Sequence, residues 1–379
     1  MVIFSKKEYL EAIRPRYLKS SKKDKSAILT EFCANCGYHP KHAIRLLNCK
    51  KYKPKRKPGK QVFYDPKIIL KPLKTIWLAT DQMCSKKLKA AIKLWLPFYE
   101  IEYGKLTDLV CQQLLKISAA TIDRLLKPTK VMFKGKGFCT TKPGALLKNQ
   151  IPIRTDNWDI KQPGFLEADT VAHCGNSLAG EFVWSITFTD ICSGWTANRA
   201  TWTKCAVGVS AQIKNMRDKL PFDLLGFDCD NGSEFLNDVL LNYFTEEKIA
   251  FTRSRPYHKN DNAHVEQKNW THVRHLLGYD RFDKPELVDL INDLYTSWNH
   301  FQNFFCPNMK LIEKIRINSK YRKKYDQPKT PFQRLIEHPM VLESKKTLLI
   351  NKLATLNPFS LKKDIILKQK KVIHALRST

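Results

Sequence analysis

The sequence predicts an α/β fold: a mixed five-stranded sheet with flanking helices, preceded by all-α helix-turn-helix domains and followed by a basic, mainly helical C-terminal region. Three observations carry this prediction. Strand-like and helix-like runs alternate between residues 163 and 280. Two patterns of helix, turn and helix precede that region. Lys and Arg recur through residues 310–333, and amphipathic helical patterns follow.

Changes in composition divide the chain into five expected parts. These are an N-terminal helix-turn-helix with a basic arm (1–62), a second helix-turn-helix domain (63–127), a linker rich in Pro, Gly and Lys (128–154), the α/β core (155–305) and the basic C-terminal region (306–379).

The first helical pattern surrounds Gly37. Residues 26–33 have helical spacing of apolar side chains, Gly37 supplies a turn, and residues 39–47 restart a helix with Pro40 in its first turn. Cys33, four positions before the glycine, is the small residue that a tight helix-turn-helix requires. A zinc site is the alternative for this segment, because its Cys and His side chains are crowded; the residues concerned are Cys33, Cys36, His39, His42 and Cys49.

The second pattern covers residues 106–126, where Ser118 is placed to cap the second helix. Patterns of this kind also occur in purely structural helical bundles, and the basic arm between the two units can also be a solvated tether. Beside a helix-turn-helix we favour phosphate contact. The candidate DNA contacts in these segments are Lys41, Arg45, Lys55, Arg56, Lys57, Ser118, Thr121 and Arg124.

The core is expected to begin with three hairpin-like strands and to continue with βαβ units. The strand-like runs are 165–172, 182–190, 195–203, 223–229 and 249–253, and the helix-like runs are 205–219, a stretch from Ser233, a stretch containing Glu266, and 284–304.

The chain carries 66 Lys and Arg against 36 Asp and Glu, a formal charge of +30. Such an excess favours a polyanionic partner, nucleic acid above all; a basic protein with no such partner is the alternative. The 11 cysteines are odd in number and irregularly spaced, which fits a reducing cytosol better than a disulfide framework. No signal peptide is evident, and no run reaches the ~18 apolar residues that a membrane helix needs.

Three acidic residues stand in contexts that suit a divalent metal site. Asp169 lies in an apolar strand-like run, Asp230 closes another such run, and Glu266 opens a helical stretch; thirty-five residues, 231–265, separate the last two. Oxygen ligands suit Mg²⁺, and two ions roughly 3.5–4 Å apart can promote an in-line displacement at phosphorus. Each acid alone also has an ordinary structural explanation, and Glu167 and Asp228 share a face with Asp169 and Asp230, so physical reasoning leaves each choice open.

The string Asp230-Asn-Gly-Ser-Glu-Phe235, with Asn260-Asp-Asn-Ala-His-Val-Glu266-Gln-Lys-Asn269, resembles the catalytic core of retroviral-type integrases and related insertion-sequence transposases. Thr189-Asp190-Ile-Cys-Ser-Gly194 fits the same family, and Tyr325–Arg334 is similar to bacterial members. The resemblance covers about 155–285. The chain departs from the retroviral pattern in the cluster around Cys33, which we interpret as part of a helical core.

The resemblance implies a ribonuclease-H-like core with Asp169, Asp230 and Glu266 as catalytic residues and ligands of two Mg²⁺ or Mn²⁺ ions. It also implies cleavage of the 3′ ends of a transposable element and their transfer into target DNA. Residues expected near that DNA are His173, Lys259, Asn262, Lys268, Asn269 and Arg274. His173 is equally well interpreted as a packed sheet residue, and Lys268 and Arg274 as solvated helix charges.

The expected partners are double-stranded DNA, both terminal inverted repeats and target, and other copies of the chain, at least as a dimer on DNA. We expect a cytoplasmic, nucleoid-associated protein of a bacterial-type cell, with no membrane association. Two alternatives remain: a domesticated sequence-specific DNA-binding protein, and a metal-dependent nuclease of the same fold without strand transfer.

Overall fold

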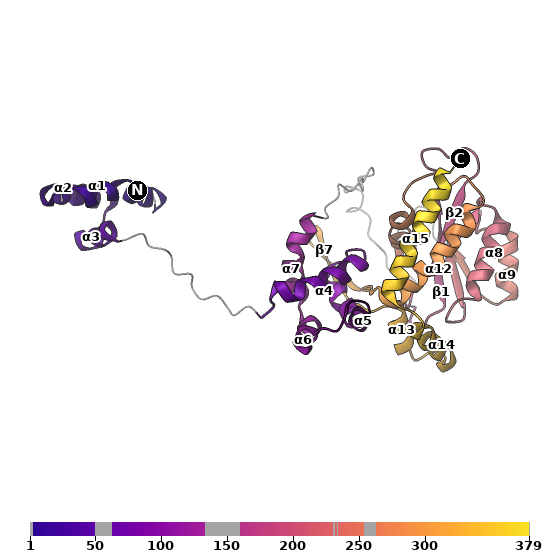
Figure 1. The fold of residues 1–379 in the computed structure, drawn as a ribbon. Coiled ribbons are helices and arrows are strands. Elements are labelled where there is room, and N and C mark those ends of the chain that lie inside the picture. Colours follow the sequence, from indigo (N-terminus) through magenta and orange to yellow (C-terminus); the bar gives the residue numbers. More distant parts are fainter. Residues whose placement is uncertain are drawn as a thin grey trace. The chain divides into compact units, whose positions relative to one another are not determined.

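The computed structural model describes residues 3–49, 63–132, 160–229, 232, 234–253 and 263–378 (Figure 1). It divides into two compact units, Met1–Phe63 and Tyr64–Thr379. Several residues expected to act in metal or DNA binding lie outside the described residues; they are Lys55, Arg56, Lys57, Asp230, Lys259 and Asn262.

The first unit is a bundle of three helices, α1 (Ile3–Lys19), α2 (Lys22–Cys36) and α3 (Pro40–Asn48). Gly37 adopts φ 66°, a left-handed conformation, and its amide donates to the Cys33 carbonyl at 2.8 Å, which ends α2. Phe32, Ala43 and Leu47 are fully buried between the helices. The predicted turn and both flanking helices are therefore present, and α1 adds a helix that the sequence patterns did not indicate.

The second unit begins with four helices: α4 (Pro66–Ala79), α5 (Ser85–Tyr103), α6 (Asp108–Lys116) and α7 (Ala119–Met132). Ser118 caps α7 as expected, because its hydroxyl accepts from the Thr121 amide at 3.1 Å. These helices share one hydrophobic core with the rest of the unit. Trp95 of α5 is fully buried and donates its indole N–H to the Phe305 carbonyl at 3.0 Å, so the helical segment is docked on the α/β core.

The predicted mixed five-stranded sheet is confirmed. Its strands are β1 (Phe165–Ala172), β2 (Val183–Asp190), β3 (Thr196–Trp202), β4 (Gly226–Cys229) and β5 (Ala250–Arg253), in the order β3-β2-β1-β4-β5. The first three are antiparallel neighbours, while β4 and β5 run parallel to β1. This arrangement is the one expected of a ribonuclease-H-like core, with β1 at its centre.

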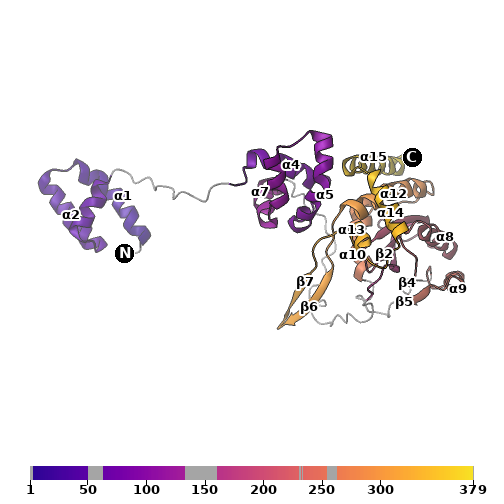
Figure 2. The same ribbon diagram turned by 90° about the horizontal axis from the view of Figure 1, so that it is seen from below.

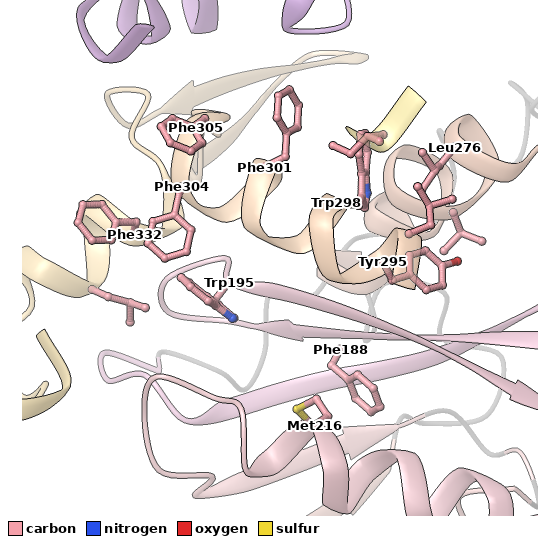
Figure 3. Close-up of a cluster of buried hydrophobic side chains, with 14 of the residues drawn as sticks. Phe188, Trp195, Met216, Leu276, Tyr295, Trp298, Phe301, Phe304, Phe305 and Phe332 are labelled. Atoms are coloured by element: carbon pink, nitrogen blue, oxygen red, sulfur yellow. The ribbon is translucent and has the colours of Figure 1, made fainter. Parts of the chain in front are cut away.

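Helices cover both faces of the sheet. On one side lie α8 (Ala206–Arg217) and α9 (Asp238–Glu246), and on the other lie α12 (Leu287–Phe305) and α15 (Pro358–Arg377) (Figure 1). Figure 3 shows the two layers, with Phe188 and Met216 on the α8 side of the strands and an aromatic row of α12 on the other. That row consists of Tyr295, Trp298, Phe301, Phe304 and Phe305, all buried.

Helix α12 also binds the outer edge of the sheet through three asparagines, which we call the asparagine ladder: Asn292, Asn299 and Asn303. Each side-chain amide accepts from the N–H and donates to the C=O of one β3 residue, at 2.9 and 3.0 Å for Ala200, 3.2 and 3.3 Å for Asn198, and 2.9 and 2.8 Å for Thr196. The ladder thereby satisfies the backbone groups of alternate residues along the edge strand.

The C-terminal region departs from the predicted mainly helical structure. Helices α13 (Pro331–Glu337), α14 (Glu343–Ala354) and α15 are present, but β6 (Leu311–Ile317) and β7 (Lys320–Tyr325) form an antiparallel ribbon before them (Figure 2). The alternation of Ile with charged residues favours strands, and Asn318, at φ 55°, supplies the tight turn. Among the described helices, none combines the length and apolar character needed to cross a membrane.

Candidate active site

Asp169 lies on the central strand β1, on the face that meets the helices following residue 263. Its Oδ1 accepts from the Thr170 amide at 2.7 Å, and its Oδ2 accepts from Asn269 Nδ2 at 2.6 Å. Thr187 of β2 pairs directly with Asp169, and Asn198 of β3 pairs with Thr187 and donates to its hydroxyl at 2.9 Å. A polar row therefore crosses three strands beside the carboxylate.

Asn269 connects this strand to the helix that carries Glu266. It begins the π-helical turn η2 (Asn269–Arg274), which continues α10 (Ala263–Lys268). Since residues three apart share one helix face, Asn269 and Glu266 are on the same side of α10 and η2. Within the described residues, the buried Oδ1 of Asn269 accepts no hydrogen bond. Short π-helical turns occur frequently at functional sites.

Glu167, which the sequence left as an alternative to Asp169 for the metal ligand, has a different role. It is 1% exposed, and its Oε2 accepts from the backbone amides of His264 and Val265 at 2.9 and 3.0 Å. Burial raises the pKa of Glu167 to about 8; the two amides act in the opposite direction, and the charges of Asp228 and Glu266 add to the increase. Glu167 therefore holds the first turn of α10 against β1.

Asp228, the alternative to Asp230 in the sequence, is likewise engaged in contacts within the sheet. Asp228 is buried on β4 directly opposite Glu167, and its Oδ1 accepts from the Thr252 hydroxyl at 2.7 Å. The charges of Asp228 and Glu266 both raise the pKa of Glu167, so several carboxylates lie close together on this face of the sheet.

The structure thus brings two of the three predicted acids to one face. Asp169 is half-buried on β1, and Glu266 is exposed in the first turn of α10. Strand β4 ends at Cys229, opposite Ala168, and Asp230 lies outside the described residues. Across the described part of the chain, to which Asp230 does not belong, no three His, Cys, Asp or Glu side chains are grouped to hold a metal.

Glu234 is a residue at this site whose role the sequence patterns did not reveal. Its buried carboxylate is ion-paired with Lys204 at 2.7 Å and accepts from the Thr170 hydroxyl at 3.0 Å. These contacts tie the chain shortly after Asp230 to the residue next to Asp169. The one indication of this role in the sequence was the position of Glu234 within the string Asp-Asn-Gly-Ser-Glu-Phe.

Asp190 explains the Thr189–Gly194 string. Its fully buried carboxylate accepts from the Gly164 amide at 2.8 Å and from the amide and hydroxyl of Ser193, both at 2.6 Å. Asp190 therefore closes the β2–β3 turn and fixes the start of β1, a structural role away from Asp169.

The side chains of His173 and Arg274 both make contacts within the protein. The His173 ring has no exposed surface, stacks on Phe282 and shares a 2.7 Å hydrogen bond with the Ser185 hydroxyl, so the structure places it as a packed sheet residue and not as a DNA contact. Burial, aided by the charge of Arg274, lowers the pKa of His173 to about 3. Arg274 donates to the Ala172 carbonyl at 2.9 Å and lies over the Tyr279 ring.

Lys268 is not a freely solvated helix charge. It is half-buried, and desolvation together with the charge of Lys87 on α5 lowers its pKa to about 8. Lys87 of α5 therefore lies near Lys268, at the end of the helix that carries Glu266.

The candidate DNA contacts on the helical segments differ in exposure. Thr121 is buried and shares hydrogen bonds of 2.9 Å with both Ser118 and Arg124, so its hydroxyl is already satisfied. Arg124 is exposed, as are Lys41 and Arg45 on α3, and Arg45 lies 3.3 Å from a ring nitrogen of His42.

The fold and the site define a class: an α/β protein with a mixed five-stranded sheet, whose central strand and opposing helix carry carboxylates on one face. The chain is 39% identical over 331 residues to the uncharacterized protein y4rM of Sinorhizobium fredii, a match covering 86% of this chain and 94% of that protein. The chain therefore belongs to the same family as y4rM. No protein-family model matches it.

Among solved structures, the catalytic core domain of BIV integrase is similar to 49% of this chain and to 97% of its own length, with a TM-score of 0.30 and 15% identity. A similarity of this size does not bear on function.

Proposed function

We propose that the chain is a DNA transposase or integrase of the acidic-triad type. It would bind the terminal inverted repeats of its own element, cleave the 3′ ends and join them to target DNA. The observation that supports this proposal most directly is the 2.6 Å hydrogen bond from Asn269 to Asp169, because it holds the helix face carrying Glu266 over the central-strand carboxylate.

The donor set suits divalent metal ions. Asp169, Asp230 and Glu266 would hold two Mg²⁺ or Mn²⁺ ions, whose bound charge offsets the repulsion among carboxylates and supplies Lewis acidity at phosphorus. The crowding of Asp228 and Glu266 around Glu167 is the feature of this structure that such ions would relieve.

The chain's own residues prepare this site. Asn269 fixes the orientation of the Asp169 carboxylate, Glu167 holds the first turn of α10 against β1, and Glu234 anchors the segment after Asp230. Positioning of this kind is what phosphoryl transfer requires, because attack by water or by a 3′-hydroxyl depends on alignment more than on a side-chain base.

The formal charge of +30 supports a polyanionic partner, and the docked helices α4–α7 offer exposed cations such as Arg124. Concerted joining of two ends calls for at least two copies of the chain on DNA.

An oligonucleotide assay tests the proposal. Purified full-length chain is incubated with duplexes copied from the DNA that flanks its coding sequence, with Mg²⁺ or Mn²⁺, and joined strands are resolved on a denaturing gel. Asp169→Asn, Asp230→Asn and Glu266→Gln should each abolish joining. The matched exposed controls Asp280→Asn and Glu246→Gln should leave it unchanged.

Three results would contradict the proposal. Joining at the wild-type level by any triad variant would rule out the mechanism. Cleavage without joining would assign a metal-dependent nuclease instead. DNA binding with neither reaction would assign a DNA-binding protein.

A further inference from the structure

The β6–β7 ribbon is a two-stranded sheet that projects from the core (Figure 2). No third described strand pairs with it. Three isoleucines of β6 are exposed in it, Ile312 at 60%, Ile315 at 45% and Ile317 at 50%. A two-stranded ribbon is marginally stable in water unless another surface packs against it. Exposed isoleucines on such a ribbon therefore indicate that a partner covers it.

The ribbon is strongly cationic. Residues 311–325 contain six Lys or Arg against the single Glu313. The register pairs Arg322 with Ile315 and Lys323 with Lys314, which places cations on both faces, because opposed residues in an antiparallel ribbon share a face. No described side chain forms an ion pair with Arg322, Lys323 or Lys324. The ribbon thus offers cations that the described part of the chain leaves without a counter-charge.

The base of the ribbon, in contrast, is fixed. Asp326, immediately after β7, accepts from the Lys310 amide at 2.6 Å and is ion-paired with Arg334 at 2.5 Å. The Lys310 ammonium donates to the Ile191 carbonyl at 2.7 Å, and so ties the ribbon to the β2–β3 turn. A capping box at Thr330 and Gln333 begins α13 directly behind this base. These contacts explain the Tyr325–Arg334 string and give an arm with a rigid base and an unsupported tip.

Charge selects the class of partner. A second copy of this chain would bring a formal charge of +30 to a cationic ribbon, whereas duplex DNA brings one negative charge per about 1.7 Å of helix axis. The major groove of B-DNA is wide enough to admit a two-stranded ribbon, and isoleucine side chains suit contact with thymine methyl groups and sugars.

We propose that the β6–β7 ribbon is a DNA-binding arm that enters the major groove of a duplex bound by the α/β core. This inference deepens the proposed function by naming a surface for the DNA. Its test measures binding in the absence of divalent metal, so that it does not depend on catalysis.

The test uses the full-length chain, a fluorescein-labelled 30-base-pair duplex and EDTA buffer, with anisotropy titrations at several salt concentrations. The ribbon variant is Arg322→Gln with Lys323→Gln and Lys324→Gln. The control removes the same charge from exposed positions on α15, by Lys370→Gln, Lys371→Gln and Arg377→Gln. Each phosphate contact contributes about 0.9 to the slope of log K against log salt, so the ribbon variant should lower the slope by about 2 to 3 and the control by less than about 0.5.

A second readout guards against misfolding of the ribbon. A benzophenone amino acid in place of Tyr321 should crosslink to the duplex on irradiation, whereas the same group in place of the exposed Leu348 on α14 should not.

An unchanged slope together with no crosslink would overturn the inference and leave the proposed function intact. A changed slope without any DNA joining by the wild type would do the reverse. A ribbon variant that loses self-association in the absence of DNA, with an unchanged slope, would identify a second copy as the partner and also overturn the inference.

Discussion

Replacing Asn269 by alanine tests the contact on which the site is built. The change removes the amide that donates to Asp169 Oδ2 at 2.6 Å, while the packing of α10 through Val265 and the two amides bound by Glu167 remain. Asp169 then keeps the Thr170 amide on Oδ1 but loses the contact that orients its Oδ2 toward η2.

The size of the effect follows from the charge on the acceptor. A hydrogen bond to a charged group contributes about 1.5–3 kcal/mol, and each 1.36 kcal/mol changes a rate tenfold, so joining should slow by about 10- to 150-fold. The loss should be smaller than that caused by Asp169→Asn, because the metal ligand itself is retained.

Single-turnover joining at saturating metal measures this rate. Gln267→Ala, an exposed neighbour on α10, is the matched control and should react at the wild-type rate. A rate within twofold of wild type for Asn269→Ala alone would refute the reasoning.

Three further predictions concern the scaffold. Trp95→Ala should cost about 3–5 kcal/mol of unfolding free energy, since it removes a buried indole and leaves the Phe305 carbonyl unpaired; a change below about 1 kcal/mol in urea unfolding would show that α5 is not docked on α12. In the folded chain the pKa of His173 is lowered to about 3, below its unfolded value near 6.5. The contribution of His173 to stability is therefore fully present above pH 6.5 and falls by about 1.4 kcal/mol per pH unit toward pH 3. His173→Gln should lack this component, and parallel pH profiles of urea unfolding for the variant and the wild type would contradict the prediction. Asn303→Leu should leave both backbone groups of Thr196 unpaired and accelerate exchange of the Thr196 amide in hydrogen–deuterium measurements, with unchanged protection as the contrary result.

The α/β core was predictable because its strands are short apolar runs that end at turn residues. The run predicted at 165–172 is the strand Phe165–Ala172, and the run at 182–190 is Val183–Asp190, whose side chains are buried at every position except Trp184. The ribbon at 311–325 was missed because its many Lys and Arg residues were interpreted as a broken basic tract, although the period of two and the Asn318 turn were present in the sequence.

The choice between neighbouring acids could not be made by periodicity. Glu167 and Asp169 share one face of β1, so only the position of α10 distinguishes them: its first amides meet Glu167, and Asn269 on η2 meets Asp169. That position depends on tertiary packing, which a local pattern does not encode. His173 illustrates the converse, since a polar residue near an acid in sequence can be fully enclosed in space.

The asparagine ladder determines how copies of this chain can assemble. An edge strand ordinarily offers a row of free N–H and C=O groups that invites strand addition by another polypeptide. On β3 the amides of Asn292, Asn299 and Asn303 already fill the place of that row. Continuation of the sheet from one molecule into the next is therefore blocked at β3, and a multimer that extended this sheet would have to add a strand at the opposite edge, β5.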